Sequence, residues 1–358
     1  MRAHKRTKCI YRAVLSISLA VLCPLLTHAS AAASVIQRSG LVYVPSHSVF
    51  FADVDEHLSW VVQPVDYLAN AGIVSGTDHC VYSPEDKLSR ADFVTMLNRA
   101  YDMEEYVGGG SFSDVSENAY YSSAVSAAKN LGIVSGDAKG KFDPKGELTR
   151  QDAMVMLRRT LNKSGLLFEP GDLGVFSDAE SISRYAQGDI AALAKAGVIS
   201  GANGKLNPKQ PVTRAEMAVM LYRAMMLEPD KDGNPAYMQR DNVVNLCVGN
   251  VFYANVTVEN AAQGQKLSGL YACEEMQGEG EDFTVKLGES RAMDQKVDWK
   301  NGILTVNGQA VTVAEDCDAV SISPYGLISD GLVSTGEAYS TAAVSLVDGV
   351  VTAVYYQK

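Results

Sequence analysis

The sequence predicts a mainly α-helical N-terminal half followed by a small all-β C-terminal domain. The helical half is indicated by three copies of one sequence unit, which recur every 60 to 64 residues. The β domain is indicated by β-branched and aromatic segments that Asn-Gly and Asp-Gly turns separate near the C-terminus. A basic and apolar leader precedes both parts.

The leader, residues 1–33, has the composition of a secretory signal peptide. It contains five of the 31 Lys and Arg residues and none of the 42 Asp and Glu residues, and an apolar run extends from Ala13 to Leu26. Small residues follow at Ala29–Ala33, as a signal peptidase requires. The apolar run is shorter than a permanent membrane span needs. We therefore expect secretion of the chain, without membrane insertion once the leader is removed.

Charge and cysteine content exclude several functions. The net charge of −11 becomes −16 without the leader, because all five of its charges are positive. Nucleic-acid binding needs a broad basic surface, so we expect no nucleic-acid partner. Beyond the leader the chain has Cys80 and three cysteines in its C-terminal third, where one disulfide can form. Their spacing matches no zinc site, so we expect no metal and no cofactor.

The repeated units span residues 51–103, 112–164 and 176–226. Each unit opens with Phe-x-Asp, continues through an aromatic residue to a Gly-x-x-Ser-Gly segment, and ends in Ser/Thr-Arg-x-Asp/Glu before an apolar stretch. This order predicts helix, Gly-rich turn, helix. A helix C-cap with positive φ is expected at the first glycine of each segment, namely Gly72, Gly132 and Gly197. Pro64 indicates that the first helix of unit one starts late.

An arginine follows the predicted N-cap of the second helix in every unit. Arg90, Arg150 and Arg214 stand at the first helical position, where a cation costs a few tenths of a kcal/mol, up to about 1 kcal/mol. The neighbouring hydroxyl and acid are explained as a capping pair, but the arginine is not. It either binds an anion together with free helix N–H groups or pairs with an acid of the Phe-x-Asp segment. The spacing alone favours neither interpretation.

The aromatic residues and the acids also allow two interpretations each. Trp60, Tyr120 and Tyr185 can stack on sugar rings or fill a core, and their helical spacing favours the core. The acids of the Phe-x-Asp segments are more typical of helix caps and turns than of ligand groups. They are Asp53, Asp114 and Asp178.

The order of these motifs strongly resembles the S-layer homology repeat, present here as a tandem of three. The resemblance implies a pseudo-threefold arrangement of helical units with grooves between neighbours. It also implies non-covalent anchoring of a surface protein to an acidic, often pyruvylated, secondary cell-wall polysaccharide or another peptidoglycan-linked polymer. The expected location is the bacterial cell wall or S-layer.

Positions that match the family motif give the candidate polysaccharide-binding residues. The resemblance implies that the arginines face an acidic sugar group, and that aromatic residues and loop glycines share the site. These residues are Arg90, Arg150, Arg214, Trp60, Tyr120, Tyr185, Gly76, Gly136 and Gly201. In unit one Thr77–Cys80 replaces the usual Gly-containing hairpin. We therefore do not expect equal use of the three grooves, and least of all use of the groove that involves unit one.

The rest of the chain is predicted from turns and strand patterns. Residues 227–241 are polar and turn-rich, which indicates a linker. Residues 242–358 are expected to form the β-rich domain, whose role the sequence does not assign. Within it Gly302–Val313 is typical of a two-stranded hairpin.

The β-rich domain shows no arrangement typical of an enzyme. No histidine follows His79, so a Ser-His-Asp arrangement cannot form there. The acidic residues between Glu274 and Asp282 fit a solvated loop better than a catalytic carboxylate pair. We therefore expect a non-enzymatic anchoring protein. A wall-anchored glycan hydrolase and a structural subunit of a surface lattice remain the alternatives.

Overall fold

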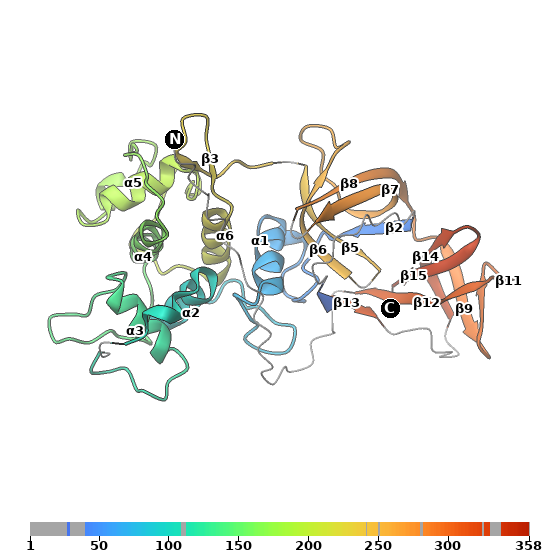
Figure 1. The fold of residues 1–358 in the computed structure, drawn as a ribbon, viewed down its shortest axis with the longest axis horizontal. Coiled ribbons are helices and arrows are strands. Elements are labelled where there is room, and N and C mark those ends of the chain that lie inside the picture. Colours follow the sequence, from blue (N-terminus) through green and yellow to red (C-terminus); the bar gives the residue numbers. More distant parts are fainter. Residues whose placement is uncertain are drawn as a thin grey trace, which may run out of the picture.

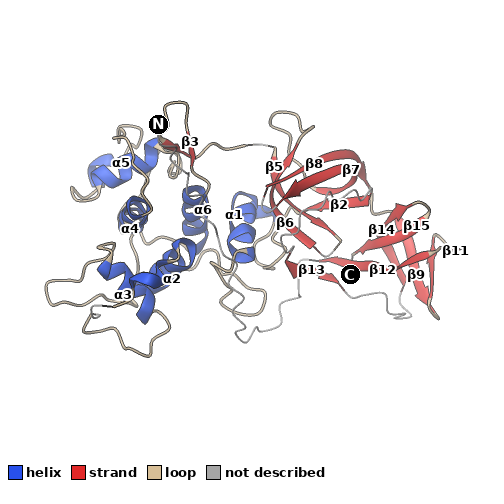
Figure 2. Cartoon of the chain, viewed as in Figure 1, coloured by secondary structure: helices blue, strands red, loops and turns tan. Residues whose placement is uncertain are grey.

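The computed structural model describes residues 27–28, 40–108, 112–240, 242–249, 251–279, 282–323, 326–329 and 338–357. The predicted signal peptide lies outside the described residues, apart from Thr27 and His28. A helical part and a β part lie side by side (Figures 1 and 2), as the sequence predicts. Across the described residues, no helix has the length and apolar content needed to cross a membrane.

Two α-helices form each of the repeated units, which confirms the helical half. The α-helices are α1 (Ser59–Asn70), α2 (Arg90–Tyr101), α3 (Ser122–Asn130), α4 (Arg150–Lys163), α5 (Gln187–Lys195) and α6 (Arg214–Met225). Short 3-10 helices accompany them at η1 (Glu56–Leu58), η2 (Met103–Tyr106) and η3 (Ala179–Ser181).

The predicted helix caps are present. The side chains of Ser89, Thr149 and Thr213 accept hydrogen bonds from the backbone N–H three residues on. Thr213 and Glu216 form a complete capping box. The predicted left-handed glycines follow the first helices, with φ of 69° at Gly72, 70° at Gly132 and 73° at Gly197.

The prediction that the first helix of unit one starts late is wrong. Helix α1 begins at Ser59 and carries Pro64 in its interior. By alignment of the units, α3 begins at a position equivalent to Val62, so α1 is the longer helix. Burial explains why the extra turn persists, because Val61, Val62 and Val65 pack in the core beside the proline. That packing offsets the hydrogen bond that proline cannot donate.

The three units close into a ring around a backbone triangle. Leu148 N–H donates to Leu88 O at 3.0 Å, Leu88 N–H donates to Val212 O at 3.0 Å, and Val212 N–H donates to Leu148 O at 2.9 Å. The three side chains are buried in one continuous hydrophobic core. Each unit therefore contacts both others, which gives the expected pseudo-threefold arrangement.

The β part consists of two packed sheets. The first sheet has the order β1-β6-β5-β2-β7-β8, from β1 (Thr27–His28), β2 (Gly40–Val44), β5 (Val243–Val248), β6 (Val251–Val258), β7 (Gly269–Glu279) and β8 (Asp282–Arg291). The second has the order β11-β10-β9-β14-β15-β12-β13, from β9 (Gln295–Lys300), β10 (Ile303–Val306), β11 (Gln309–Ala310), β12 (Val313–Ser323), β13 (Gly326–Ser329), β14 (Ala338–Val347) and β15 (Val350–Tyr356).

Strand β2 is the unpredicted member of the first sheet. It precedes the helical units in the chain, yet it lies between β5 and β7 in the sheet. Leu41 and Tyr43 of β2 enter the core between the two sheets, where the Tyr355 hydroxyl donates to Leu41 O at 3.2 Å. The β domain therefore includes residues before the repeats as well as residues after them.

The predicted hairpin forms with local differences, and the predicted linker segment contains a further hairpin. Asn307-Gly308 joins β10 to β11, so the expected hairpin forms, although its second strand is short. The predicted linker carries a two-stranded hairpin of β3 (Glu228–Pro229) and β4 (Pro235–Ala236). This hairpin leads to Tyr237, whose N–H donates to Ala196 O of unit three at 2.7 Å.

Two expectations for the C-terminal third are wrong. The acidic residues from Glu274 onward lie in strands β7 and β8 rather than in a loop, and Glu274 pairs with Lys286 across the hairpin at 3.0 Å. The register of the β7–β8 pairing shifts between Cys273 and Glu275, and both Glu274 and Glu275 face solvent without a loop. The possible disulfide does not form at Cys247 or Cys273, whose buried thiols are unpaired.

Candidate functional site

Each arginine of the repeat reaches across to the next unit. Arg90 Nε donates to Phe142 O of unit two at 2.9 Å, and Arg150 Nε donates to Leu206 O of unit three at 2.8 Å. Arg214 Nε closes the ring by donating to Tyr82 O of unit one at 2.7 Å. We call these contacts the first, second and third interfaces, respectively. The three contacts are cyclic equivalents of one another.

The N–H groups at the start of each second helix are not free. In α2 the N–H of Arg90 donates to Gly146 O at 3.1 Å and the N–H of Ala91 donates to Pro144 O at 3.0 Å. The same two bonds recur at α4 and α6, and the capping Ser or Thr accepts from the next N–H. Any anion at these positions must therefore be bound by side chains rather than by the helix N–H groups.

The acids of the Phe-x-Asp segments hold the loops that the arginines contact. Asp114 accepts from Phe142 N–H and Asp143 N–H, both at 2.8 Å. Asp53 and Asp178 do the same for the equivalent loops of their own units. Although desolvation opposes ionisation, these N–H donors lower the pKa of Asp114. The interpretation as turn-forming residues is confirmed.

The terminal nitrogens of the three arginines have different environments. Arg214 is only 8 % exposed, lies over the Tyr82 ring, and its Nη2 donates to Ser75 O at 2.8 Å. Arg150 Nη1 lies 2.6 Å from Glu216 Oε1. The N–H bonds of Nη1 are not aligned with this contact, so the attraction is Coulombic rather than a directed hydrogen bond.

Arg90 makes fewer contacts than the other two arginines. Beyond its Nε bond, its guanidinium lies 4.9 Å from the centre of the Phe142 ring. Among the described residues neither of its Nη atoms has a hydrogen-bond or ion-pair partner, and the side chain is half-buried. Arg90 therefore keeps the N–H groups of both Nη atoms for an external group.

The aromatic residues at or just before the start of the first helices do not fill the core. Trp60 is 52 %, Tyr120 70 % and Tyr185 57 % exposed. The core residue five positions on, Val125 in the case of Tyr120, is fully buried. Tyr120 and Tyr185 each lie two residues before α3 and α5 begin, so the helical spacing does not determine where their rings point. The interpretation as core residues is therefore wrong.

Two of these aromatic residues also cross an interface. The Tyr185 hydroxyl donates to Asp152 Oδ1 at 2.6 Å, and the Tyr120 hydroxyl donates to Asp92 Oδ1. Burial, together with the hydrogen bond that its hydroxyl donates to the Asp92 carboxylate, raises the pKa of Tyr120 to about 12. Burial and the hydrogen bond to Asp152 raise the pKa of Tyr185 in the same way. Both phenols therefore stay protonated as donors at neutral pH. Trp60, at the equivalent position of unit one, has no hydroxyl.

The loop glycines are explained by close packing. A Cβ on Gly136 would lie 2.9 Å from the Phe112 ring and 3.0 Å from Lys141 O. Gly76 and Gly201 meet equivalent backbone and ring atoms of their own units. The Phe of the Phe-x-Asp segment and this glycine thus form one packed pair. A role of the glycines in ligand binding stays a prediction.

The altered loop of unit one keeps the backbone of its counterparts. Thr77 N–H donates to Val81 O at 2.8 Å, as Asp137 N–H donates to Lys141 O at 2.8 Å in unit two. Cys80 takes the left-handed conformation with φ of 52°, where unit two has Gly140 with φ of 72°. The departure in sequence therefore adds local backbone strain without changing the hairpin.

Sequence reasoning missed the main-chain acceptors of the arginines. The carbonyls of Tyr82, Phe142 and Leu206 serve this purpose, and backbone groups have no signature in a sequence. It also missed Gln151, whose Nε2 donates to the Tyr185 hydroxyl at 2.6 Å. The available signal was that Gln151 stands where the other units have Ala91 and Ala215.

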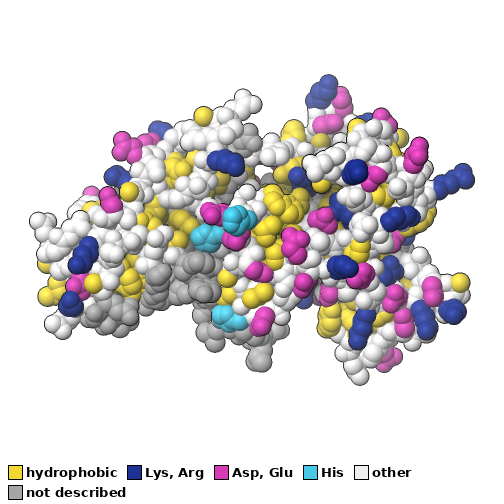
Figure 3. All heavy atoms as spheres, turned by 180° about the vertical axis from the view of Figure 1, so that it is seen from behind, with side chains coloured by type: hydrophobic (Ala, Val, Ile, Leu, Met, Phe, Trp, Pro, Cys, Tyr) yellow, Lys and Arg dark blue, Asp and Glu magenta, His cyan; other side chains and the backbone are white. Residues whose placement is uncertain are grey.

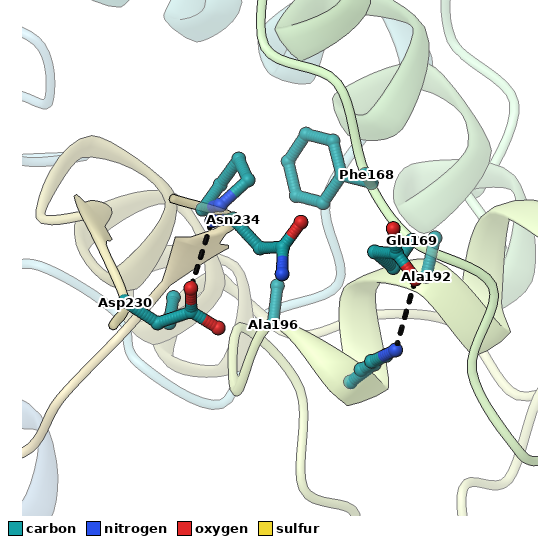
Figure 4. A pocket seen from close by; sticks show the side chains of 9 residues that line it. Phe168, Glu169, Ala192, Ala196, Asp230 and Asn234 are labelled. Atoms are coloured by element: carbon teal, nitrogen blue, oxygen red, sulfur yellow. Dashed lines mark hydrogen bonds and ion pairs between the residues drawn. The ribbon is translucent and has the colours of Figure 1, made fainter. Parts of the chain in front are cut away.

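A surface pocket elsewhere contains none of the predicted site residues. It lies between α5, the segment at Phe168 and the hairpin of the linker (Figure 4). Lys195 pairs with Glu169 across it at 3.5 Å. On the face drawn in Figure 3, Lys and Arg side chains are scattered among Asp and Glu side chains. The pocket is therefore not lined by a basic cluster, and the mixed charges on that face do not form an extended basic surface.

Comparison with known proteins supports the assignment of the helical half. The family model of the S-layer homology domain matches residues 50–94, 111–154 and 175–218. The Surface-layer 125 kDa protein of Lysinibacillus sphaericus is 29 % identical over 66 % of this chain and 20 % of its own length. The Amylopullulanase of Thermoanaerobacterium thermosulfurigenes is 31 % identical over 51 % of this chain and 10 % of its own length.

The Exoglucanase XynX of Acetivibrio thermocellus is similar in the same way, with 32 % identity over 49 % of this chain and 16 % of its own length. The chain thus spans a tenth to a fifth of the length of these relatives. S-layer homology domains are cell-wall anchoring modules of surface-layer proteins and of glycan hydrolases, which assigns the chain to the cell surface. Its three repeated units are three S-layer homology domains.

Proposed function

We propose that the protein anchors itself to the bacterial cell wall by binding an acidic secondary wall polysaccharide at the interfaces between its three units. The observation that carries the proposal is the repeated pairing of an interface arginine with an exposed aromatic residue. Guanidinium groups bind carboxylates, and exposed aromatic rings provide a flat apolar surface for a sugar ring. A pyruvylated sugar presents both a carboxylate and a sugar ring.

The test is sedimentation of the purified full chain with bacterial wall sacculi. The protein is expected to sediment with sacculi that keep their secondary polymer and to stay in solution when the polymer has been removed chemically. Exchange of Arg90, Arg150 and Arg214 for alanine together should abolish sedimentation. Retained sedimentation of a folded triple variant would show that the arginines are not the binding groups.

The β domain is proposed as a non-catalytic part that the anchor holds at the wall. Its acidic hairpin contains an exposed ion pair between Glu274 and Lys286, with side chains 48 % exposed each. Among the described residues, no group of His, Cys, Asp and Glu is arranged to hold a metal ion. No observation favours the anchored hydrolase or the lattice subunit over this proposal, so neither is advanced.

A further inference from the structure

The three interfaces differ in the charge that is left for a ligand. Arg214 is buried and uses two nitrogens for carbonyl oxygens of unit one. Arg150 faces the carboxylate of Glu216, and the side chains of this pair are 12 % and 36 % exposed. Arg90 faces no carboxylate within ion-pair distance in the described part of the chain. Equivalent positions therefore have unequal access to an external anion.

The ion pair of Arg150 follows from two departures in the repeat. Glu216 stands where the other units have Asp92 and Asp152, so its carboxylate reaches one methylene further. The Tyr hydroxyl and the capping hydroxyl both hold Asp152, through Tyr185 at 2.6 Å and Thr149 at 2.6 Å. At the position of that tyrosine, unit one has Trp60, which offers no hydroxyl to Glu216.

Glu216 consequently has one oxygen for each of two tasks. Oε2 accepts from Thr213 N–H at 3.0 Å and completes the capping box, while Oε1 lies beside Arg150. An acidic sugar group that approached Arg150 would have to compete with this half-buried carboxylate. It would also meet the like charge of Glu216, which disfavours binding of a second anion.

We propose that Glu216 neutralises the second interface and that Arg214 is a structural cross-link, so that the chain binds one acidic group, at Arg90. This inference rests on the proposed function and narrows it from three equivalent interfaces to the first one. It differs from the expectation that the interfaces involving unit one are the least used. At the first interface unit one provides Arg90, whereas its altered loop lies at the third interface, against Arg214.

The experiment uses four full-length variants in the sacculus sedimentation assay. Arg90→Ala should bind polymer-bearing sacculi roughly 10- to 100-fold more weakly, the loss expected for a hydrogen-bonded charged group. Arg150→Ala should bind like the wild type. Glu216→Gln should bind more tightly, because it frees Arg150 while glutamine keeps the capping box. The double variant Arg90→Ala/Glu216→Gln should regain binding through Arg150.

A matched control is Glu169→Gln, which removes the acid from an exposed ion pair between Glu169, in the segment before unit three, and Lys195 of unit three. This control should change binding to sacculi little. If removal of any negative charge strengthened binding, Glu169→Gln would gain as much as Glu216→Gln. Circular dichroism of each variant establishes that the helices are intact. If Arg90→Ala does not fold, the binding of Glu216→Gln tests the proposal instead. Tighter binding of this variant supports the neutralisation of Arg150 by Glu216, and unchanged binding contradicts it.

The outcomes distinguish failure of the proposed anchoring function from failure of the assignment of Arg90 as the single anion site. No sedimentation of the wild type with polymer-bearing sacculi contradicts the proposed function itself. Wild-type sedimentation with undiminished binding of folded Arg90→Ala, or with no gain in Glu216→Gln, leaves the anchoring role intact and overturns the assignment of Arg90 as the single anion site.

Discussion

At the scale of single residues, two side chains from neighbouring units build each interface without touching each other. Asp114 holds the peptide N–H groups of the loop at Phe142, and Arg90 holds the carbonyl of the same residue from the neighbouring unit. The loop is therefore fixed from both sides. A ligand that contacts Arg90 meets a guanidinium that is already oriented, which reduces the entropy lost on binding.

Exchange of Asp114 for alanine tests this arrangement. Two backbone N–H groups would lose their acceptor, so we expect the free energy of unfolding to fall by about 1–3 kcal/mol. Urea unfolding followed by circular dichroism measures the change. Glu117→Ala, which alters an exposed acid of the same unit, should leave the midpoint almost unchanged. Equal effects of the two variants would contradict the role of Asp114.

A buried carboxyl group connects unit one to the β domain. Asp66 of α1 accepts from Val49 N–H at 3.1 Å and from the Ser48 hydroxyl. Burial raises its pKa to about 7, and hydrogen bonds from Ser48 and Val49 oppose the shift only in part. The titratable groups near it are Tyr43 of β2 and Cys247 of β5, whose own pKa values are raised by burial.

The raised pKa predicts a stability that falls with pH. In the unfolded chain an aspartate ionises near pH 3.9, whereas folded Asp66 does so near pH 7. The folded state thus binds the extra proton between these values, and its stability falls by up to about 1.4 kcal/mol per pH unit as pH rises. Asp66→Asn cannot ionise, so it should differ least from the wild type at pH 4 and gain melting temperature relative to the wild type between pH 4 and pH 8. A stability difference that is the same at both pH values would contradict this.

At the scale of elements, glycine conformation decides how the helices end and how the loops pack. Gly136 lies against the Phe112 ring, whereas Gly188 of α5 has no atom within 4 Å of the position of a Cβ. These two glycines form a matched pair for substitution. The first is required by packing, and the second weakens a helix through its flexibility.

Alanine substitution should therefore change stability in opposite directions. Gly188→Ala is expected to raise the free energy of unfolding by about 0.5–1 kcal/mol, since alanine restricts the unfolded chain and favours the helix. Gly136→Ala should lower it, because the Phe112 ring or Lys141 O must move. Thermal unfolding measures both. Destabilisation by Gly188→Ala would contradict the free space around the Cβ position of residue 188.

The elements that the sequence predicts are those with local signals. Caps such as Thr213 with Glu216 and turns such as Asn307-Gly308 depend on neighbouring residues, so a linear pattern reveals them. Strand β2 has only five residues, and its pairing partners Cys247 and Tyr271 are more than two hundred residues away. A pattern that short cannot identify such partners. The exposure of Tyr120 was missed because this residue precedes α3, so the helical spacing that favoured a core position does not apply to it.

At the scale of the whole molecule, the three S-layer homology domains are inserted into the β domain. Strand β2 comes before them and β5 after them, and the two strands pair at Tyr43 and Cys247. The two parts also meet through side chains, since the Tyr222 hydroxyl of α6 donates to Asn255 Oδ1 of β6 at 2.8 Å. Figure 1 shows α1 and α6 as the helices nearest the sheets. The β domain is thus attached to the anchor at two chain crossings and by several polar contacts, which include the bond from Gln63 Nε2 to Asn255 Oδ1 at 3.1 Å.

Removal of β2 tests the insertion. A chain that lacks residues 1–44 leaves β5 and β7 without the strand that separates them, so we expect proteolysis to digest the β domain while the helical units resist. A chain that lacks only residues 1–33 keeps β2 and should resist throughout. Limited proteolysis with mass spectrometry identifies the fragments. Equal resistance of the two chains would contradict a central position of β2.

The most direct test of wall anchoring is calorimetric titration of the full chain with purified secondary wall polysaccharide. We expect saturable binding that weakens with added salt and disappears when the acidic groups of the polysaccharide are removed. Binding that is equally strong to the polysaccharide without its acidic groups would contradict it.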